Sequence, residues 1–279
     1  MRVTAIQMQP GHDKAANIAQ ASALVTAAVE ADRPTMVSLP EMWSCLGGTR
    51  AVKLAEAEHL PAPGEDAAPG SAYALLRDMA RGAGIFVHGG SIAERDADGQ
   101  LANTTVVFDP DGREIARYRK IHMFDITAPD GTSYRESDNY RPGDKIVTFM
   151  ADGRTVGCTI CYDLRFPELF LALRRAGAEI VMLPSAFTLQ TGKDHWEVLI
   201  RARAIETQTW LVAAATTGRH EDGRGATRLT YGHTMIVDPW GHVVARASDG
   251  IGFTSARIDP ALTERVRRDM PVLEHRRLA

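Results

Sequence analysis

The sequence contains the same strand–turn–strand pattern twice, and this repeat limits the folds that the chain can adopt. In the first copy, apolar strands expected near residues 101–108 and 114–119 are joined by Asp-Pro-Asp-Gly at 109–112. In the second, Met-Ile-Val at 235–237 and Val-Val-Ala-Arg at 243–246 are joined by Asp-Pro-Trp-Gly at 238–241. Pro and Gly at these positions suit a tight turn, so each copy predicts a β-hairpin. We therefore expect two related halves.

Short apolar strands alternate with helical segments in both halves. The strands are expected at about 3–8, 36–39, 85–88, 155–160, 180–183 and 210–215, and the helices at 14–31 with Asp13 as cap, at 71–83, from Pro167 onward and at 195–207. Two mixed sheets packed face to face with helices outside would bury every apolar face, so we expect one layered α/β domain. Residues 121–145 are the exception, because 124–141 within them show little hydrophobic periodicity and make a connection that is long for a compact domain. Such loops are usually functional or disordered.

Charge and composition exclude several classes of partner. Lys and Arg number 32 against 35 Asp and Glu, a net charge of −3, so no basic excess is available to hold nucleic acid. No apolar run approaches the roughly 18 residues that cross a bilayer, and the N-terminus does not resemble a signal peptide. The three cysteines, Cys45, Cys158 and Cys161, cannot all pair with one another. We expect a reduced cytoplasmic protein that binds neither nucleic acid nor membrane.

Cys161 is the first candidate for chemistry, because it lies where a β-type segment gives way to a helix beginning at Pro167. A thiol beside a helix N-terminus is favoured as thiolate, and the exposed N–H groups there can bind a developing oxyanion. The Cys158-x-x-Cys161 spacing also permits a dithiol or metal site completed by His or carboxylate ligands. A buried inert cysteine and a strand-end cysteine without a role are equally compatible with the spacing.

Two further segments place charged residues at predicted strand ends. Glu41 directly follows Leu39-Pro40, where a carboxylate can point into a cleft and act as a general base with a raised pKa. Taken alone, Glu41 is more simply an ordinary loop acid. Lys120 ends the run Arg117-Tyr118-Arg119-Lys120, which taken alone is most simply a solvated strand edge that blocks sheet pairing.

Taken together, the three segments resemble the nitrilase, or carbon–nitrogen hydrolase, superfamily, whose Glu-Lys-Cys set lies at successive strand ends. The matching segments are Leu-Pro-Glu at 39–41, Tyr-Arg-Lys-Ile-His at 118–122 and Cys-Thr-Ile-Cys-Tyr-Asp-Leu-Arg-Phe-Pro-Glu at 158–168. The resemblance continues through residues 185–208, 231–233 and 238–241. It is strongest to the Nit branch, which includes omega-amidases and deaminated glutathione amidases. It implies a four-layer αββα sandwich and a single carbon–nitrogen hydrolase domain over residues 1–279.

The resemblance also implies roles for individual residues. Cys161 would be the nucleophile, Glu41 the general base and Lys120 the cation that stabilises the tetrahedral intermediate, aided by the backbone N–H of Tyr162. Glu136, within the irregular loop, matches a further family glutamate that orients the lysine or the substrate. A homodimer or larger homo-oligomer is implied, and the reaction needs neither metal nor cofactor.

The predicted function is therefore a cytoplasmic amidase that releases ammonia from a small carboxylate-bearing amide through a Cys161 thioester. Arg165 lies just before Pro167, where the helix dipole disfavours a cation, so we expect it to pair with a substrate carboxylate; the alternative is a surface cation. An N-carbamoyl amino-acid hydrolase or a nitrilase would use the same three residues. A catalytically silent or metal-binding scaffold built on Cys158 and Cys161 is the alternative from a different class.

Overall fold

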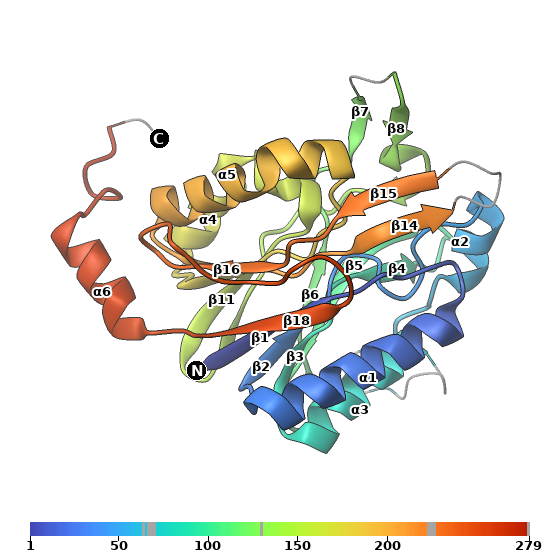
Figure 1. The fold of residues 1–279 in the computed structure, drawn as a ribbon, viewed down its shortest axis with the longest axis horizontal. Helices are drawn as coiled ribbons and strands as arrows, with labels where there is room; N and C mark the ends of the chain where they lie inside the picture. The colour runs from blue at the N-terminus through green and yellow to red at the C-terminus, as the bar shows by residue number, and fades with distance from the viewer. Residues whose placement is uncertain (63–64, 66–70, 129–130, 222–226, 278–279) are drawn as a thin grey trace.

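Two large β-sheets lie between two pairs of helices in the computed structural model, which describes residues 1–62, 65, 71–128, 131–221 and 227–277 (Figure 1). The first sheet has the order β18-β1-β2-β3-β5-β4, with β6 and β9 also paired to β5. Its strands are β1 (Arg2–Gln7), β2 (Met36–Ser38), β3 (Phe86–His88), β4 (Ile92–Arg95), β5 (Leu101–Phe108), β6 (Glu114–Arg119), β9 (Tyr140–Arg141) and β18 (Gly252–Arg257).

The second sheet repeats this mixed arrangement with the order β10-β11-β12-β13-β16-β17. Its strands are β10 (Thr148–Ala151), β11 (Arg154–Cys158), β12 (Ile180–Met182), β13 (Trp210–Ala213), β16 (Met235–Val237) and β17 (Val243–Arg246). Three central strands run parallel in each sheet: β1, β2 and β3 in the first, and β11, β12 and β13 in the second. The strands that flank each of these trios are antiparallel to their neighbours in the trio. Parallel neighbours matter for function, because their carboxyl ends meet at one edge of the sheet.

Helices form the two outer layers (Figure 1). The helices are α1 (Lys14–Asp32), α2 (Arg50–Glu56), α3 (Ala72–Ala83), α4 (Pro167–Arg175), α5 (Leu189–Thr207) and α6 (Pro260–Asp269). Side chains of α1 and α3 pack on the first sheet, as in the fully buried cluster of Ile6, Leu76 and Val87. A second cluster joins residues of both sheets to α4 and α5. This succession of helix, sheet, sheet and helix is the predicted αββα sandwich.

The hairpin repeat is confirmed down to its hydrogen bonds. β5–β6 and β16–β17 are antiparallel pairs, and each has a register shift next to its turn. In the first turn one carboxylate oxygen of Asp109 accepts from the backbone N–H groups two and four residues later, and Asp238 does the same in the second. Gly112 and Gly241 close the turns with φ values of 78° and 92°, which favour glycine. Because both turns use the same hydrogen bonds and the same glycine, the Asp-Pro-x-Gly pattern in the sequence predicted both hairpins.

Most element boundaries agree with the sequence predictions, and the main correction concerns α5. Asp13 caps α1 as its position suggested, and Ser71, expected as the first residue of the next helix, is the cap of α3. However, α5 begins at Leu189 with Thr188 as its cap, and not at His195. The added first turns are largely exposed, so they lack the apolar spacing that identifies a helix. Gly192 is the buried residue of these turns. A Cβ at this position would lie 2.2 Å from Cβ of Tyr231 in β15 (Thr227–Tyr231), so only glycine fits there.

The stretch expected to be irregular contains short ordered elements. β7 (Asp125–Thr127) pairs with β8 (Ser133–Arg135), and the short 3-10 helix η1 (Glu136–Asp138) follows at once. A second short hairpin, β14 (Thr217–Glu221) with β15, was not predicted, nor were α2, β4, β18 and α6. Within the part of the chain that the structure describes, no helix combines the length and apolar character needed to span a bilayer.

Candidate active site

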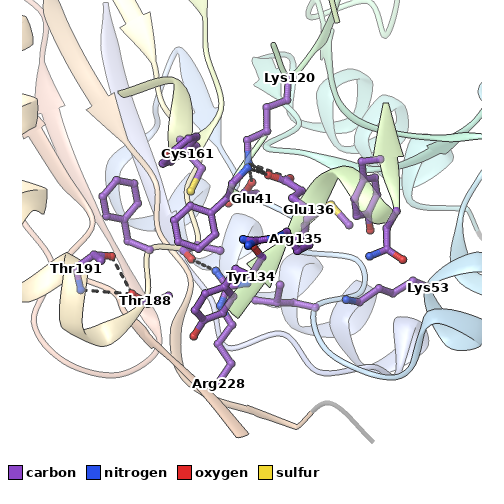
Figure 2. Close-up of a pocket in the computed structure, with 18 of the residues that line it drawn as sticks. Glu41, Lys53, Lys120, Tyr134, Arg135, Glu136, Cys161, Thr188, Thr191 and Arg228 are labelled. Atoms are coloured by element: carbon purple, nitrogen blue, oxygen red, sulfur yellow. Dashed lines mark hydrogen bonds and ion pairs between the residues drawn. The ribbon is translucent and has the colours of Figure 1, made fainter. Parts of the chain in front are cut away.

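All six residues singled out from the sequence line one pocket, with a volume of about 190 Å³ (Figure 2). They are Glu41, Lys120, Glu136, Cys161, Tyr162 and Arg165. Glu41 follows β2, Lys120 follows β6, and Cys161 opens the 3-10 helix η2 (Cys161–Arg165) shortly after β11. The pocket therefore forms where strand ends of the two sheets meet, and the β7–β8–η1 segment closes one side with Glu136.

A buried ion cluster lies at the base of the pocket. The Lys120 ammonium donates to Oε1 of Glu41 at 2.9 Å and to both carboxylate oxygens of Glu136 at 3.0 and 2.8 Å. Lys120 is only 1% exposed. The backbone N–H of Phe124 donates to Oε2 of Glu136 at 2.7 Å and so fixes this carboxylate. One buried cation is thus held between two anions, which is the arrangement that compensates the cost of burying charge.

Asn103 belongs to this cluster and was missed by sequence reasoning. Its Nδ2 donates to Oε1 of Glu41 at 2.9 Å and to Oε1 of Glu136 at 3.2 Å. The backbone N–H of Lys120 donates to the Asn103 carbonyl at 2.9 Å, so the pairing of β5 with β6 sets the two residues side by side. The available signal was a buried amide in the otherwise largely apolar strand Leu101–Phe108. Asn103 joins the two carboxylates and holds Lys120 in line with them.

The electrostatics of the cluster keep its members charged. Burial alone would raise the pKa of Glu41, but the charge of Lys120, the neighbouring Cys161 thiol and a hydrogen bond from Lys120 outweigh it, so the pKa falls below its ordinary value. The raised pKa expected for Glu41 from its position after a strand is therefore wrong. For Lys120, burial favours the neutral amine, but Glu136 and Glu41 raise its pKa well above the ordinary value. At neutral pH Glu41 is therefore a carboxylate and Lys120 an ammonium ion.

Cys161 adopts an unusual backbone conformation and is a protonated thiol at rest. Its φ of 48° is left-handed, and its N–H donates to the Pro184 carbonyl at 2.9 Å. Burial and the neighbouring charge of Glu41 raise the pKa of the thiol well above its ordinary value. The expectation that this junction favours a thiolate is therefore wrong for the free protein. Glu41 lines the same pocket and influences the pKa of the thiol, so a proton acceptor lies near the sulfur.

The backbone N–H of Tyr162, the residue after Cys161, is the oxyanion donor expected from the sequence. Among the described residues, no backbone carbonyl outside η2 accepts it, whereas the N–H of Cys161 is occupied by Pro184. Tyr162 lines the same pocket as Lys120 and Cys161, which is compatible with that expectation.

Asp163 connects the nucleophile segment to the end of β6. Its fully buried carboxylate accepts from Tyr118 Oη at 2.6 Å, from the N–H of Ile160 at 2.8 Å and from the N–H of His122 at 3.1 Å. It also lies 2.7 Å from Nδ1 of His122. These partners flank Lys120 and precede Cys161, so Asp163 fixes the spacing between the two sheets at the site.

Arg165 lies at the pocket wall, as its sequence position suggested. Its Nη2 is 3.3 Å from Nδ1 of His195, and its guanidinium lies over the rings of Tyr162 and Phe187, with centroids 5.7 and 5.5 Å away.

Cys158, in contrast, is fully buried in the core and does not line the pocket. The described residues contain no group of three or more His, Cys, Asp or Glu side chains that would hold a metal ion.

Comparisons with known proteins agree with this geometry. The family model described as carbon-nitrogen hydrolase matches residues 2–268. A deaminated glutathione amidase of Yersinia enterocolitica is 45% identical over 205 residues, covering 72% of this chain and 70% of that protein. One of Synechocystis sp. is 38% identical over 276 residues, covering 98% and 96%. The crystal structure of Saccharomyces cerevisiae Nit3, a member of branch 10 of the nitrilase superfamily, superposes with a TM-score of 0.87 at 30% identity, covering 100% of this chain and 97% of that one.

Proposed function

The chain belongs to the carbon–nitrogen hydrolase family and is an amide-hydrolysing enzyme, and from this premise we propose that it cleaves a small carboxylate-bearing amide through a thioester on Cys161. The observation that carries the proposal is the contact set of Glu41. This one carboxylate accepts from the Lys120 ammonium at 2.9 Å and lies close enough to the Cys161 thiol that each of the two groups shifts the pKa of the other. A base, a cation and a nucleophile therefore share one centre, which is what attack on an unreactive amide carbonyl requires.

The first half of the reaction forms the thioester. Glu41 takes the thiol proton as the Cys161 sulfur attacks the amide carbonyl carbon. Lys120 and the N–H of Tyr162 hold the resulting oxyanion. The C–N bond breaks as Glu41 returns the proton to the departing nitrogen, which leaves as ammonia or an amine, and Cys161 keeps the acyl group.

The second half hydrolyses the thioester and restores the site. Glu41 removes a proton from water as the water oxygen attacks the thioester carbonyl carbon, and the same two donors hold the new oxyanion. The C–S bond then breaks, the acid product leaves, and the sulfur is reprotonated from Glu41. Glu136 and Asn103 are positioning residues in this scheme, because both hold the Lys120–Glu41 pair and neither meets the sulfur.

Several finer features belong to the same proposal. We assign Arg165 to a substrate carboxylate, since a guanidinium fork binds carboxylate through two parallel bonds. The family match over residues 2–268 supports one domain across residues 1–279. A cytoplasmic location fits the three free cysteines. We expect a homodimer or larger homo-oligomer, which light scattering coupled to gel filtration measures.

The decisive experiment is product release across a panel of amides combined with trapping of the intermediate. Deaminated glutathione and ω-amides of dicarboxylic acids should be hydrolysed, with N-carbamoyl amino acids and nitriles as the competing classes. Acid quenching followed by peptide mass spectrometry should locate an acyl adduct on Cys161. Cys161→Ala should abolish both signals, and Cys158→Ala is the matched control. An adduct on Cys158, or turnover by Cys161→Ala, would refute the mechanism.

A further inference from the structure

Arg228 is a pocket cation that neither the sequence motifs nor the proposed mechanism uses. It lies in β15, opposite His220 of β14, and its side chain lines the same pocket as the ion cluster (Figure 2). Its guanidinium carbon lies 5.7 Å from the centroid of the Tyr134 ring. Its Nη2 donates to the backbone carbonyl of Ala186 at 2.5 Å. The β14–β15 hairpin thus delivers a positive charge to the site from a separate part of the chain.

Most of the donors of this guanidinium are unused within the described part of the chain. A guanidinium has five N–H donors, and the contact to Ala186 occupies one of them. Nε of Arg228 is buried and has no hydrogen-bond partner there. Among the described residues, no carboxylate forms an ion pair with Arg228, although Glu41 and Glu136 line the same pocket and are held by Lys120. A partly buried cation with free donors in a pocket is suited to an anion that enters the pocket.

The segment from Pro184 to Ala186 links Arg228 to the nucleophile. The backbone N–H of Cys161 donates to the Pro184 carbonyl at 2.9 Å, and two residues later the Ala186 carbonyl accepts from Arg228. The charge of Arg228 also contributes to the low pKa of Glu41, after the larger effects of Lys120 and the Cys161 thiol, which together outweigh burial. Arg228 therefore lies near the part of the pocket that an acyl group bonded to Cys161 would occupy.

Arg165 contacts a different ring of the pocket wall. The ring of Phe124 lies 5.2 Å from those of Tyr134 and Tyr162, measured between centroids. Arg228 lies over Tyr134, whereas Arg165 lies over Tyr162 and Phe187. The two guanidinium groups therefore have different aromatic partners, and a substrate with two carboxylates has a cation for each.

We propose that Arg228 is a specificity-determining residue that binds a carboxylate on the acyl part of the substrate, the part that Cys161 retains as a thioester. The inference rests on the proposed function, because it presumes that an acyl group is bonded to Cys161. It adds the residue that selects the acyl group and assigns it to β15. An acyl chain that ends in a carboxylate can satisfy the free donors of Arg228 while its carbonyl carbon reaches the sulfur.

The test compares glutaramate with pentanamide, which differ only in a carboxylate or a methyl group at the end of the same acyl chain. Arg228→Met should lower kcat/KM for glutaramate by about 10- to 100-fold, the loss expected for a charge-assisted hydrogen bond. The value for pentanamide should change by less than about 3-fold, since it makes no such bond. Arg228→Lys should give an intermediate loss, because lysine keeps the charge without the planar fork. Arg219→Met is the matched control, since Arg219 is exposed in the same hairpin.

A binding measurement separates this inference from the proposed function. Calorimetric titration of glutarate into Cys161→Ala should give binding that Arg228→Met in the same background weakens by about 10-fold or more. This readout needs no turnover, so it decides on Arg228 even if neither amide is hydrolysed. Equal losses of kcat/KM on both amides would assign Arg228 a structural role and overturn the proposal. Glutarate binding that is absent, or unchanged by Arg228→Met, would overturn it as well.

Discussion

Replacing Asp163 by Asn tests whether one buried carboxylate holds the two halves of the site together. Each carboxylate oxygen of Asp163 accepts one backbone N–H and one side-chain group: Oδ2 serves Ile160 and Tyr118, and Oδ1 serves both groups of His122. An amide replaces one of these oxygens by a donor. The Tyr118 hydroxyl and the His122 ring can reverse their roles and accept, but a backbone N–H cannot.

Either orientation of the substituted amide therefore leaves one backbone N–H without its acceptor. A buried unsatisfied donor costs about 1–3 kcal/mol, so the free energy of unfolding should fall by this amount. Because the N–H of Ile160 precedes Cys161, and Tyr118 and His122 flank Lys120, kcat should also fall by about 10- to 100-fold, as small misplacements of reacting groups do. KM should change little, since Asp163 does not line the pocket.

Urea unfolding at one fixed protein concentration measures the stability change, and steady-state kinetics measure kcat. Tyr118→Phe is the comparison variant, because it removes one partner and leaves Asp163 with its backbone bonds. Asp163→Asn should be the more damaging of the two. A variant within about 0.5 kcal/mol of the wild type with unchanged kcat would refute the assignment of Asp163 as the connection between the sheets.

Three further outcomes are expected. Glu41→Gln and Lys120→Met should each lower kcat by roughly 100-fold or more, because base catalysis and oxyanion stabilisation each contribute that much. If steady-state kinetics give either variant a kcat near the wild-type value, the residue substituted in that variant has no part in the mechanism. Iodoacetamide should modify Cys161 of the free enzyme slowly at pH 7 and faster as the pH rises past the ordinary thiol range, because the raised pKa of Cys161 keeps the thiol protonated. Mass spectrometry measures the rate at which the adduct forms. A modification rate that already reaches its maximum at neutral pH would contradict the assignment. Arg165→Lys should lower kcat/KM more for an amide that carries a second carboxylate, beside the one assigned to Arg228, than for the analogue without that second group. Equal losses would leave Arg165 structural.

Much of the secondary structure could be predicted from the sequence, because it depends on local patterns of residues. The Asp-Pro-x-Gly turns, the cap at Asp13 and the apolar strands each depend on neighbouring residues, and each is confirmed. The start of α5 was misplaced for the same reason, since its first exposed turns carry no apolar spacing. Short hairpins such as β14–β15 were missed because a polar edge pair gives a weak periodic signal.

The identity of the main site residues was also available from the sequence, through motifs whose order matches the family. Their chemical state was not. Whether Cys161 is a thiol or a thiolate depends on burial and on the distance to Glu41, and these are set by two sheets that pack together from distant parts of the chain. The nearby helix N-terminus alone would lower the pKa of the Cys161 thiol, but the effect of burial is larger and raises it.

The partners around the motifs were decided by tertiary structure alone. Asn103 enters the site because β5 pairs with β6, and Arg228 lines it because the β14–β15 hairpin reaches Ala186. Neither has a spacing relation to Glu41, Lys120 or Cys161 that the sequence could reveal. Local hydrogen bonding and periodicity thus determine which segments form strands and helices, whereas long-range packing determines which side chains share one pocket and what charge each carries there.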